Sequence, residues 1–204
     1  MLNLATPAIA PLLVFGWGNP SRGDDALGPM LLEQLETRLA AQHWVGVQCL
    51  TDFQLQVEHA LDLGGRQRVL FVDASLRCAA PFEITRLTPA RDHSFTSHAM
   101  SPQAVMQVFR ELHGRAPPPC NLLAIRGERF ELGEPPTAVA LAHLTLALAA
   151  ALHWLAAQAP TQQDARADGK IELGGGPTRQ NTPDQLRTER RNAPVCPAKP
   201  EIGD

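Results

Sequence analysis

The sequence lacks the signatures of several protein classes. No C-x-x-C pair occurs, and the four cysteines lie far apart, at Cys49, Cys78, Cys120 and Cys196. This spacing argues against a zinc knuckle or a disulfide framework and favours reduced, cytoplasmic thiols. Charge of one sign is not in surplus, since the formal net charge is -3, and this argues against a nucleic-acid partner. The G-x-S-x-G and H-E-x-x-H motifs are absent, so neither a serine-hydrolase elbow nor that zinc-peptidase helix is indicated.

Long hydrophobic runs are also few. Residues 137–157 carry no charge and are long enough for a membrane span. Their many alanines, the internal His143 and His153 and the missing basic flank favour a buried C-terminal helix packed on a sheet instead. The N-terminal stretch "MLNLATPAIAPLLVFGW" has no basic region and is broken by prolines, so it is interpreted as a short leader followed by a strand. We therefore expect no membrane partner.

The remaining pattern alternates between strands and helices. Apolar runs predict strands at 12–16, 45–50, 68–74, 82–87 and 122–126, and helical spacing predicts helices at 28–41, 54–63, 102–113 and 137–158. The run "RVLFVDA" is typical of a central parallel strand that is covered on both faces. Together these elements predict one α/β domain of three layers, α/β/α, with a twisted, mainly parallel five-stranded sheet.

The composition changes after residue 158. Residues 159–204 contain no aromatic residue and are rich in Pro, Gly, Gln, Arg and Asp, so they can bury little apolar surface. We expect a folded domain over residues 1–158 and a flexible, disordered polar tail over 159–204.

Truncation after Gln158 is therefore expected to leave a folded core, because the removed segment has little to bury. Thermal unfolding of the full chain and the truncated chain checks this prediction. A large loss of thermal stability on truncation would contradict it.

The glycine-rich stretch "FGWGNPSRGDDALG" follows the first predicted strand and resembles a dinucleotide-binding turn in outline. Ser21 stands where the third glycine of G-x-G-x-x-G is required, and no Walker lysine follows. Two acidic residues at the end of the loop would repel a phosphate. We interpret Asp24 as the cap of the next helix and Asp25 as a carboxylate facing the cleft, while a nucleotide-binding module remains an alternative that calorimetry with NAD and ATP would test.

Three polar side chains follow predicted strands. Asp73 lies at the end of a predicted buried strand, Asp25 follows another in the glycine-rich loop, and His98 lies in the loop "SFTSHAMSP" before a helix, with His93 as its competitor. Ligands gather at the carboxyl ends of the strands in such sheets. Two carboxylates and one imidazole suit a first-row divalent metal and leave coordination positions open. The sequence thus predicts a cation site made of Asp25, Asp73 and His98.

Four stretches in this order, "GWGNPSRGDDALG", "DFQLQVEHALDL", "VLFVDAS" and "TSHAMSP", together resemble the endopeptidases that mature [NiFe]-hydrogenases. The stretch "DFQLQVEHA" looks most like the branch that serves cytoplasmic NAD-reducing, or bidirectional, hydrogenases. The resemblance covers about residues 12–157 and makes residues 1–158 the peptidase domain. The segment "IRGE", with Gly127 and Glu128, falls in a shared stretch and is interpreted as shaping a peptide groove.

The resemblance implies an aspartyl-type, nickel-dependent endopeptidase that removes the C-terminal extension of a hydrogenase large-subunit precursor once nickel has been inserted. It places the metal-binding and catalytic positions on Asp25, Asp73 and His98, with Asp24 as a substitute for Asp25. Nickel is expected to arrive with the precursor and to bind only weakly to the protease itself. We expect a cytoplasmic monomer whose partner is that precursor. A non-enzymatic nickel-binding assembly chaperone is the alternative.

Overall fold

The computed structural model describes residues 9–92 and 100–158. The predicted leader, the loop that carries His93 and His98, and the predicted tail at 159–204 lie outside these described residues.

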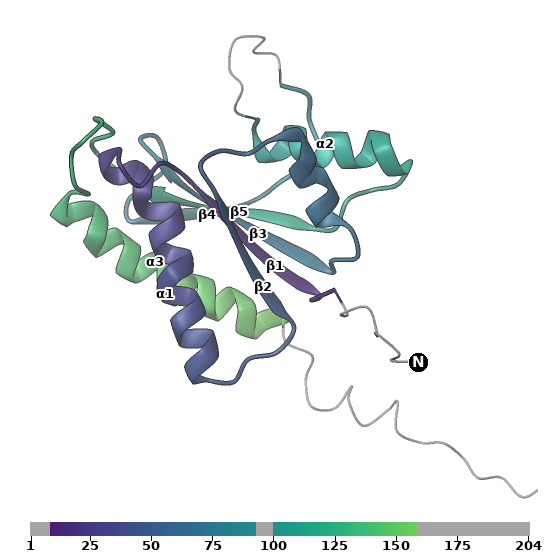
Figure 1. The fold of residues 1–204 in the computed structure, drawn as a ribbon, viewed down its shortest axis with the longest axis horizontal. Coiled ribbons are helices and arrows are strands. Elements are labelled where there is room, and N and C mark those ends of the chain that lie inside the picture. The colour runs from purple at the N-terminus through teal and green to yellow at the C-terminus, as the bar shows by residue number, and fades with distance from the viewer. Residues whose placement is uncertain (1–8, 93–99, 159–204) are drawn as a thin grey trace, which may run out of the picture. The chain divides into compact units, whose positions relative to one another are not determined.

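The described chain is built on one mixed five-stranded sheet (Figure 1). The strand order is β2-β1-β3-β5-β4, and only β4 runs antiparallel to its neighbour. The strand bounds are Leu12–Trp17 (β1), Val47–Asp52 (β2), Arg68–Ser75 (β3), Phe82–Arg86 (β4) and Cys120–Arg126 (β5). This confirms the predicted α/β class and the mainly parallel sheet. The central β3 is buried over Val69–Val72, as its continuous apolar run predicts.

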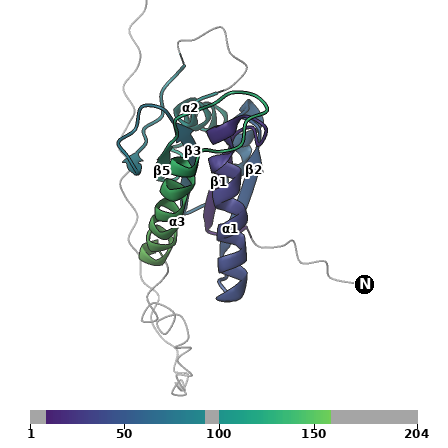
Figure 2. The same cartoon turned by 90° about the vertical axis from the view of Figure 1, so that its left-hand side faces the viewer.

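Helices cover both faces of this sheet. The helices α1 (Leu27–Ala41) and α3 (Ala138–Gln158) pack on one face and lie beside each other (Figure 2). The 3-10 helix η2 (Val57–Leu63) and α2 (Pro102–His113) pack on the other. Each face has its own buried apolar cluster, and burial of one leucine side chain in such a cluster stabilises the fold by roughly 1.5–3 kcal/mol.

The uncharged C-terminal helix is α3. By length and composition alone it could cross a membrane, with a mean hydropathy of 1.8 over its most apolar window. In the structure it packs through one face, with Leu144, Leu148 and Leu155 buried in the cluster shared with α1. The prediction that this segment is a helix packed on the sheet is confirmed.

Besides β5, which begins two residues earlier than predicted, at Cys120, two predicted elements differ from the structure. The predicted helix at 54–63 is a 3-10 helix that starts only at Val57, because Gln56 is extended and its amide donates to His59 Nδ1. The second strand runs two residues later than predicted at both ends, since Gly46 takes a φ of +79° and keeps Val45 out of the sheet. Both differences lie where local hydrogen bonds or backbone conformation override apolar spacing.

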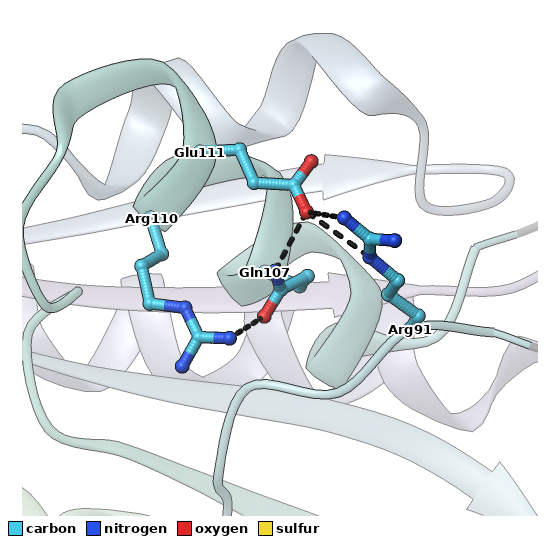
Figure 3. A network of polar contacts seen from close by, with 4 residues as sticks. All are labelled: Arg91, Gln107, Arg110 and Glu111. Carbon is cyan, nitrogen blue, oxygen red and sulfur yellow. Dashed lines mark hydrogen bonds and ion pairs between the residues drawn. The ribbon is translucent and has the colours of Figure 1, made fainter. Parts of the chain in front are cut away.

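Helix α2 agrees with its sequence signals and fixes the chain around the undescribed segment 93–99. Ser101 caps its start by accepting the Ala104 amide, and Gly114 ends it in the left-handed conformation. On the exposed side of α2, Glu111 accepts from Gln107 and from Arg91 (Figure 3). Asp92 accepts the Ser101 amide at 2.9 Å, which bonds the residue before α2 to the described chain at residue 92.

The strand order creates a switch point between β1 and β3. From β1 the chain crosses to β2 on one side, whereas from β3 it continues to β4 and β5 on the other. In open α/β sheets, ligands bind outside the carboxyl ends of the strands at such a point. The two predicted carboxylates lie on these two strands' side of the switch point: Asp73 is within β3 near its carboxyl end, and Asp25 lies in the 3-10 helix η1 (Gly23–Ala26) after the loop that follows β1.

Candidate active site

Asp73 lies near the carboxyl end of β3 and is half-buried. Its Oδ1 accepts the Ala74 amide at 2.9 Å. Burial raises the pKa of Asp73 to about 7, the Ala74 hydrogen bond opposes this shift, and the negative charge of Asp25 adds to it. Asp25 therefore lies close enough to Asp73 for its charge to contribute to this shift, after burial as the main cause. A cation bound beside two neighbouring carboxylates would offset their mutual repulsion.

Asp25 is held by the glycine-rich loop that precedes it. Its Oδ2 accepts the Asn19 amide at 2.9 Å, and the Asn19 side chain accepts the Ser21 amide. Gly18 at the start of this loop donates its own amide to the Asp52 carbonyl at 3.1 Å, which ties the loop to the end of β2. The loop is therefore a turn in which the Asn19 amide is bonded to the Asp25 carboxylate and the Ser21 amide to the Asn19 side chain.

The backbone at Gly18 leaves no room for a side chain. Its φ is +142°, and a Cβ there would lie 1.9 Å from the Asp25 carbonyl oxygen. Gly18→Ala is therefore expected to lower the free energy of unfolding by roughly 2–4 kcal/mol, measured by urea denaturation.

Gly133→Ala is the matched control for this substitution. Gly133 also has a positive φ, of +84°, but a Cβ there would meet nothing within 4 Å. It should cost only the conformational penalty of about 1–2 kcal/mol. Equal losses in the two variants would contradict the close approach at Gly18.

Asp24 does not cap α1, which corrects the prediction. Neither η1 nor α1 has a side-chain cap, and the Asp24 side chain is fully buried. Its Oδ2 accepts the amides of Glu128 and Arg129, and its Oδ1 accepts the Thr137 amide at 2.6 Å. Burial alone would raise the pKa of Asp24, but these donors together lower it below its usual value. Both oxygens are thus engaged, whereas the Asp25 carboxylate accepts one amide, that of Asn19, from the described part of the chain.

A cleft of about 340 Å³ opens beside the glycine-rich loop. Its lining consists of Gly18, Pro20, Pro29, Thr51, Asp52 and Phe53. Phe53 is 66% exposed, and Asp52 Oδ2 lies 3.3 Å from His59 Nε2. The sequence reasoning assigned no role to Asp52 and placed His59 only as a helix residue. The available signal was the position of Asp52 at a strand end, the same signal that identified Asp73.

His98 lies outside the described residues, so the predicted ligand set is described only in part. Among residues 9–92 and 100–158, no three His, Cys, Asp or Glu side chains form a group that could hold a metal ion. The first described residue after residue 98 with a hydrogen bond to another part of the chain is Met100, whose amide donates to the Leu55 carbonyl at 3.0 Å. Leu55 belongs to the loop that leaves the carboxyl end of β2, beside the cleft.

The fold is that of the [NiFe]-hydrogenase maturation proteases, whose solved structures the chain resembles at low sequence identity. The likeness supports a hydrolase, in agreement with the class predicted from the sequence. No family model and no curated protein sequence matches the chain.

Three solved structures illustrate the likeness. The hydrogenase maturating endopeptidase HybD from E. coli is 25% identical, with a TM-score of 0.57, over 72% of this chain and 93% of its own. An endopeptidase from Escherichia coli, solved in solution, is 23% identical over the same shares, also with a TM-score of 0.57. The [NiFe] hydrogenase maturation protease HycI from Thermococcus kodakarensis KOD1 is 22% identical, with a TM-score of 0.53, over 68% of this chain and 88% of its own.

Proposed function

We propose that this protein is a nickel-dependent endopeptidase that removes the C-terminal extension of a hydrogenase large-subunit precursor after nickel insertion. The observation that carries the proposal is the pair Asp25 and Asp73 at the β1/β3 switch point of a fold shared with a hydrogenase maturating endopeptidase. The precursor of an NAD-reducing hydrogenase is the proposed substrate, and the cytoplasm is the proposed site of action. The stretch "DFQLQVEHA" supports the choice of that hydrogenase branch.

The donor chemistry fits a cation that arrives with the substrate. Asp25 and Asp73 supply hard oxygen ligands, and we propose His98 as the third ligand. Three such ligands hold nickel weakly by comparison with the thiolates of a precursor, so the protease alone is expected to stay largely metal-free. The positive charge of nickel would distinguish a loaded precursor and attract its C-terminal segment to the sheet edge where Asp25 and Asp73 lie.

The carboxylates of the chain supply the remaining chemistry. Asp73, with a pKa of about 7, exchanges its proton close to neutral pH, so an arriving cation can replace that proton at little cost. Asp25 keeps its position through the Asn19 amide while the precursor binds. The cleft beside Gly18 and Phe53 is large enough to accept part of an extended peptide beside the loop that holds Asp25.

The alternative is a nickel-binding assembly chaperone without enzymatic activity. It is favoured by the same ligands and by the absence of any sequence motif for a nucleophile. Incubation of the protein with nickel-loaded precursor separates the two functions. The endopeptidase shortens the large subunit on a gel and releases a C-terminal peptide, whereas the chaperone changes the nickel content of the precursor and leaves its mass unchanged.

A further inference from the structure

Asp24 joins three segments that are far apart in the sequence. Its fully buried carboxylate belongs to η1, the element that also carries Asp25. It accepts the amides of Glu128 at 2.7 Å and Arg129 at 3.0 Å, which follow β5. It also accepts the amide and the hydroxyl of Thr137, the residue before α3. One side chain thus satisfies four donors from the loop after β5 and from the start of α3.

The backbone around Asp24 is packed too closely to move independently. The Asp24 amide donates to the Arg129 carbonyl at 2.8 Å, so residues 24 and 129 are bonded in both directions. A Cβ on Gly127 would lie 2.9 Å from Asp24 Cβ, and a Cβ on Gly23 would lie 2.6 Å from the Arg129 carbonyl oxygen. Only glycine at these two positions permits this approach. Segments 23–25 and 127–129 are therefore hydrogen-bonded and closely packed against each other.

We infer that Asp24 is a positioning residue of the active site. It fixes the backbone of η1, which carries Asp25, and it holds segment 127–129 in place against η1. The effect of Asp24 on cleavage rests on the proposed function, whereas its effect on the position of Asp25 does not. A metal or substrate ligand must be held within about 0.5 Å of its working position, and a side chain on a short 3-10 helix needs external support for this. Asp24 supplies that support and takes no part in binding the cation, because both of its oxygens are already hydrogen-bonded.

Asp24→Asn tests the inference, since the amide nitrogen of asparagine would face backbone donors in place of an acceptor oxygen. Hydrogen exchange of the metal-free protein is the first measurement. The amides that face the new NH2 group should exchange at least about tenfold faster, because they lose their acceptor: Glu128 and Arg129 if it takes the place of Oδ2, or Thr137 if it takes the place of Oδ1. The amide of Asn19 should also exchange faster, because it is bonded to Asp25 and reports on the position of that carboxylate. Unchanged exchange at Asn19 would overturn the inference and leave Asp24 with a structural role only.

Kinetics with nickel-loaded precursor provide the second measurement, made at a temperature where the variant is folded. Asp24→Asn should lower kcat at least about tenfold and change KM little, because a misplaced carboxylate affects the reacting geometry more than the docking of the precursor. A wild-type kcat in the variant would overturn the inference. If the wild-type protein cleaves no precursor, the proposed function fails, while exchange at Asn19 still decides the role of Asp24.

Thr137 offers a matched pair of variants that leave the acid in place. Thr137→Ser keeps the hydroxyl that donates to Asp24 and accepts from the Ala140 amide, so exchange at Asn19 should remain as in the wild type. Thr137→Val keeps the shape and loses the hydroxyl, so exchange at Asn19 should rise, though less than in Asp24→Asn. Equal behaviour of the two Thr137 variants would contradict the chain of contacts from α3 to Asp25.

Discussion

Asp25→Asn and Asp73→Asn are each expected to reduce cleavage of nickel-loaded precursor by at least about a hundredfold. Each substitution keeps the size of the side chain and removes a negative charge from a site where two carboxylates influence each other. A neutral amide oxygen is a poorer ligand for a divalent cation than a carboxylate, so the variants should lose the interaction that draws the loaded precursor. Initial rates of cleavage, followed by the intact mass of the large subunit, measure the effect.

Glu33→Gln is the matched control for both variants. Glu33 is an exposed acid on α1, and its replacement makes the same change of a carboxylate into an amide. Its rate of cleavage should equal that of the wild type. Wild-type rates in Asp25→Asn or Asp73→Asn would remove that residue from the site.

Asp73→Asn is also expected to make the metal-free protein more stable at pH 8. An aspartate carboxyl group in the unfolded chain has a pKa of 3.8, and burial raises that of Asp73 to about 7 in the folded protein. A folded-state pKa above the unfolded value means that this group favours folding below pH 3.8 and loses that contribution as the pH rises through 7. Asparagine does not titrate, so the variant lacks this pH-dependent loss. Its free energy of unfolding at about pH 8 should exceed that of the wild type by roughly 2–4 kcal/mol.

The pH dependence distinguishes this effect from ordinary repacking. Near pH 4, where the folded wild type keeps the Asp73 proton, Asp73→Asn and the wild type should have similar free energies of unfolding. Urea denaturation at pH 4 and pH 8 gives both values, with Glu33→Gln as the control that should show no such divergence. A constant difference between Asp73→Asn and the wild type at both pH values would refute the shifted pKa. A more stable but inactive variant would indicate that the site is maintained for function at a cost in stability.

Much of the fold follows from local patterns in the sequence. The run around β3 is apolar on both faces and predicts a central strand, and Ser101, Pro102 and Gly114 define α2 with correct ends. The edge strand β4 alternates in the sequence and is mostly exposed in the structure. In these elements, each residue acts through neighbours within a few positions along the chain, so the sequence contains the information directly.

The roles of the acids at the site depend on distant partners. Asp73 could be predicted because a charged residue at the end of a buried strand needs a partner wherever it lies. Asp24 was assigned to the wrong helix, because its donors lie 104 to 113 residues further along the chain. The pairing of Asp52 with His59 was missed for a different reason: the two residues are close in sequence, but their contact depends on how η2 folds back against the end of β2. The position of His98 remains a prediction from the sequence.

The central claim is that Asp25 and Asp73 belong to a site that accepts a precursor only when the precursor carries nickel. The most direct test follows the intact mass of the large-subunit precursor over time, with wild-type protein and either nickel-loaded or nickel-free precursor. We predict loss of the C-terminal peptide from the loaded precursor and an unchanged mass for the nickel-free one. Equal cleavage of both precursors would contradict the claim, because the carboxylate edge would then not depend on nickel to recognise its substrate.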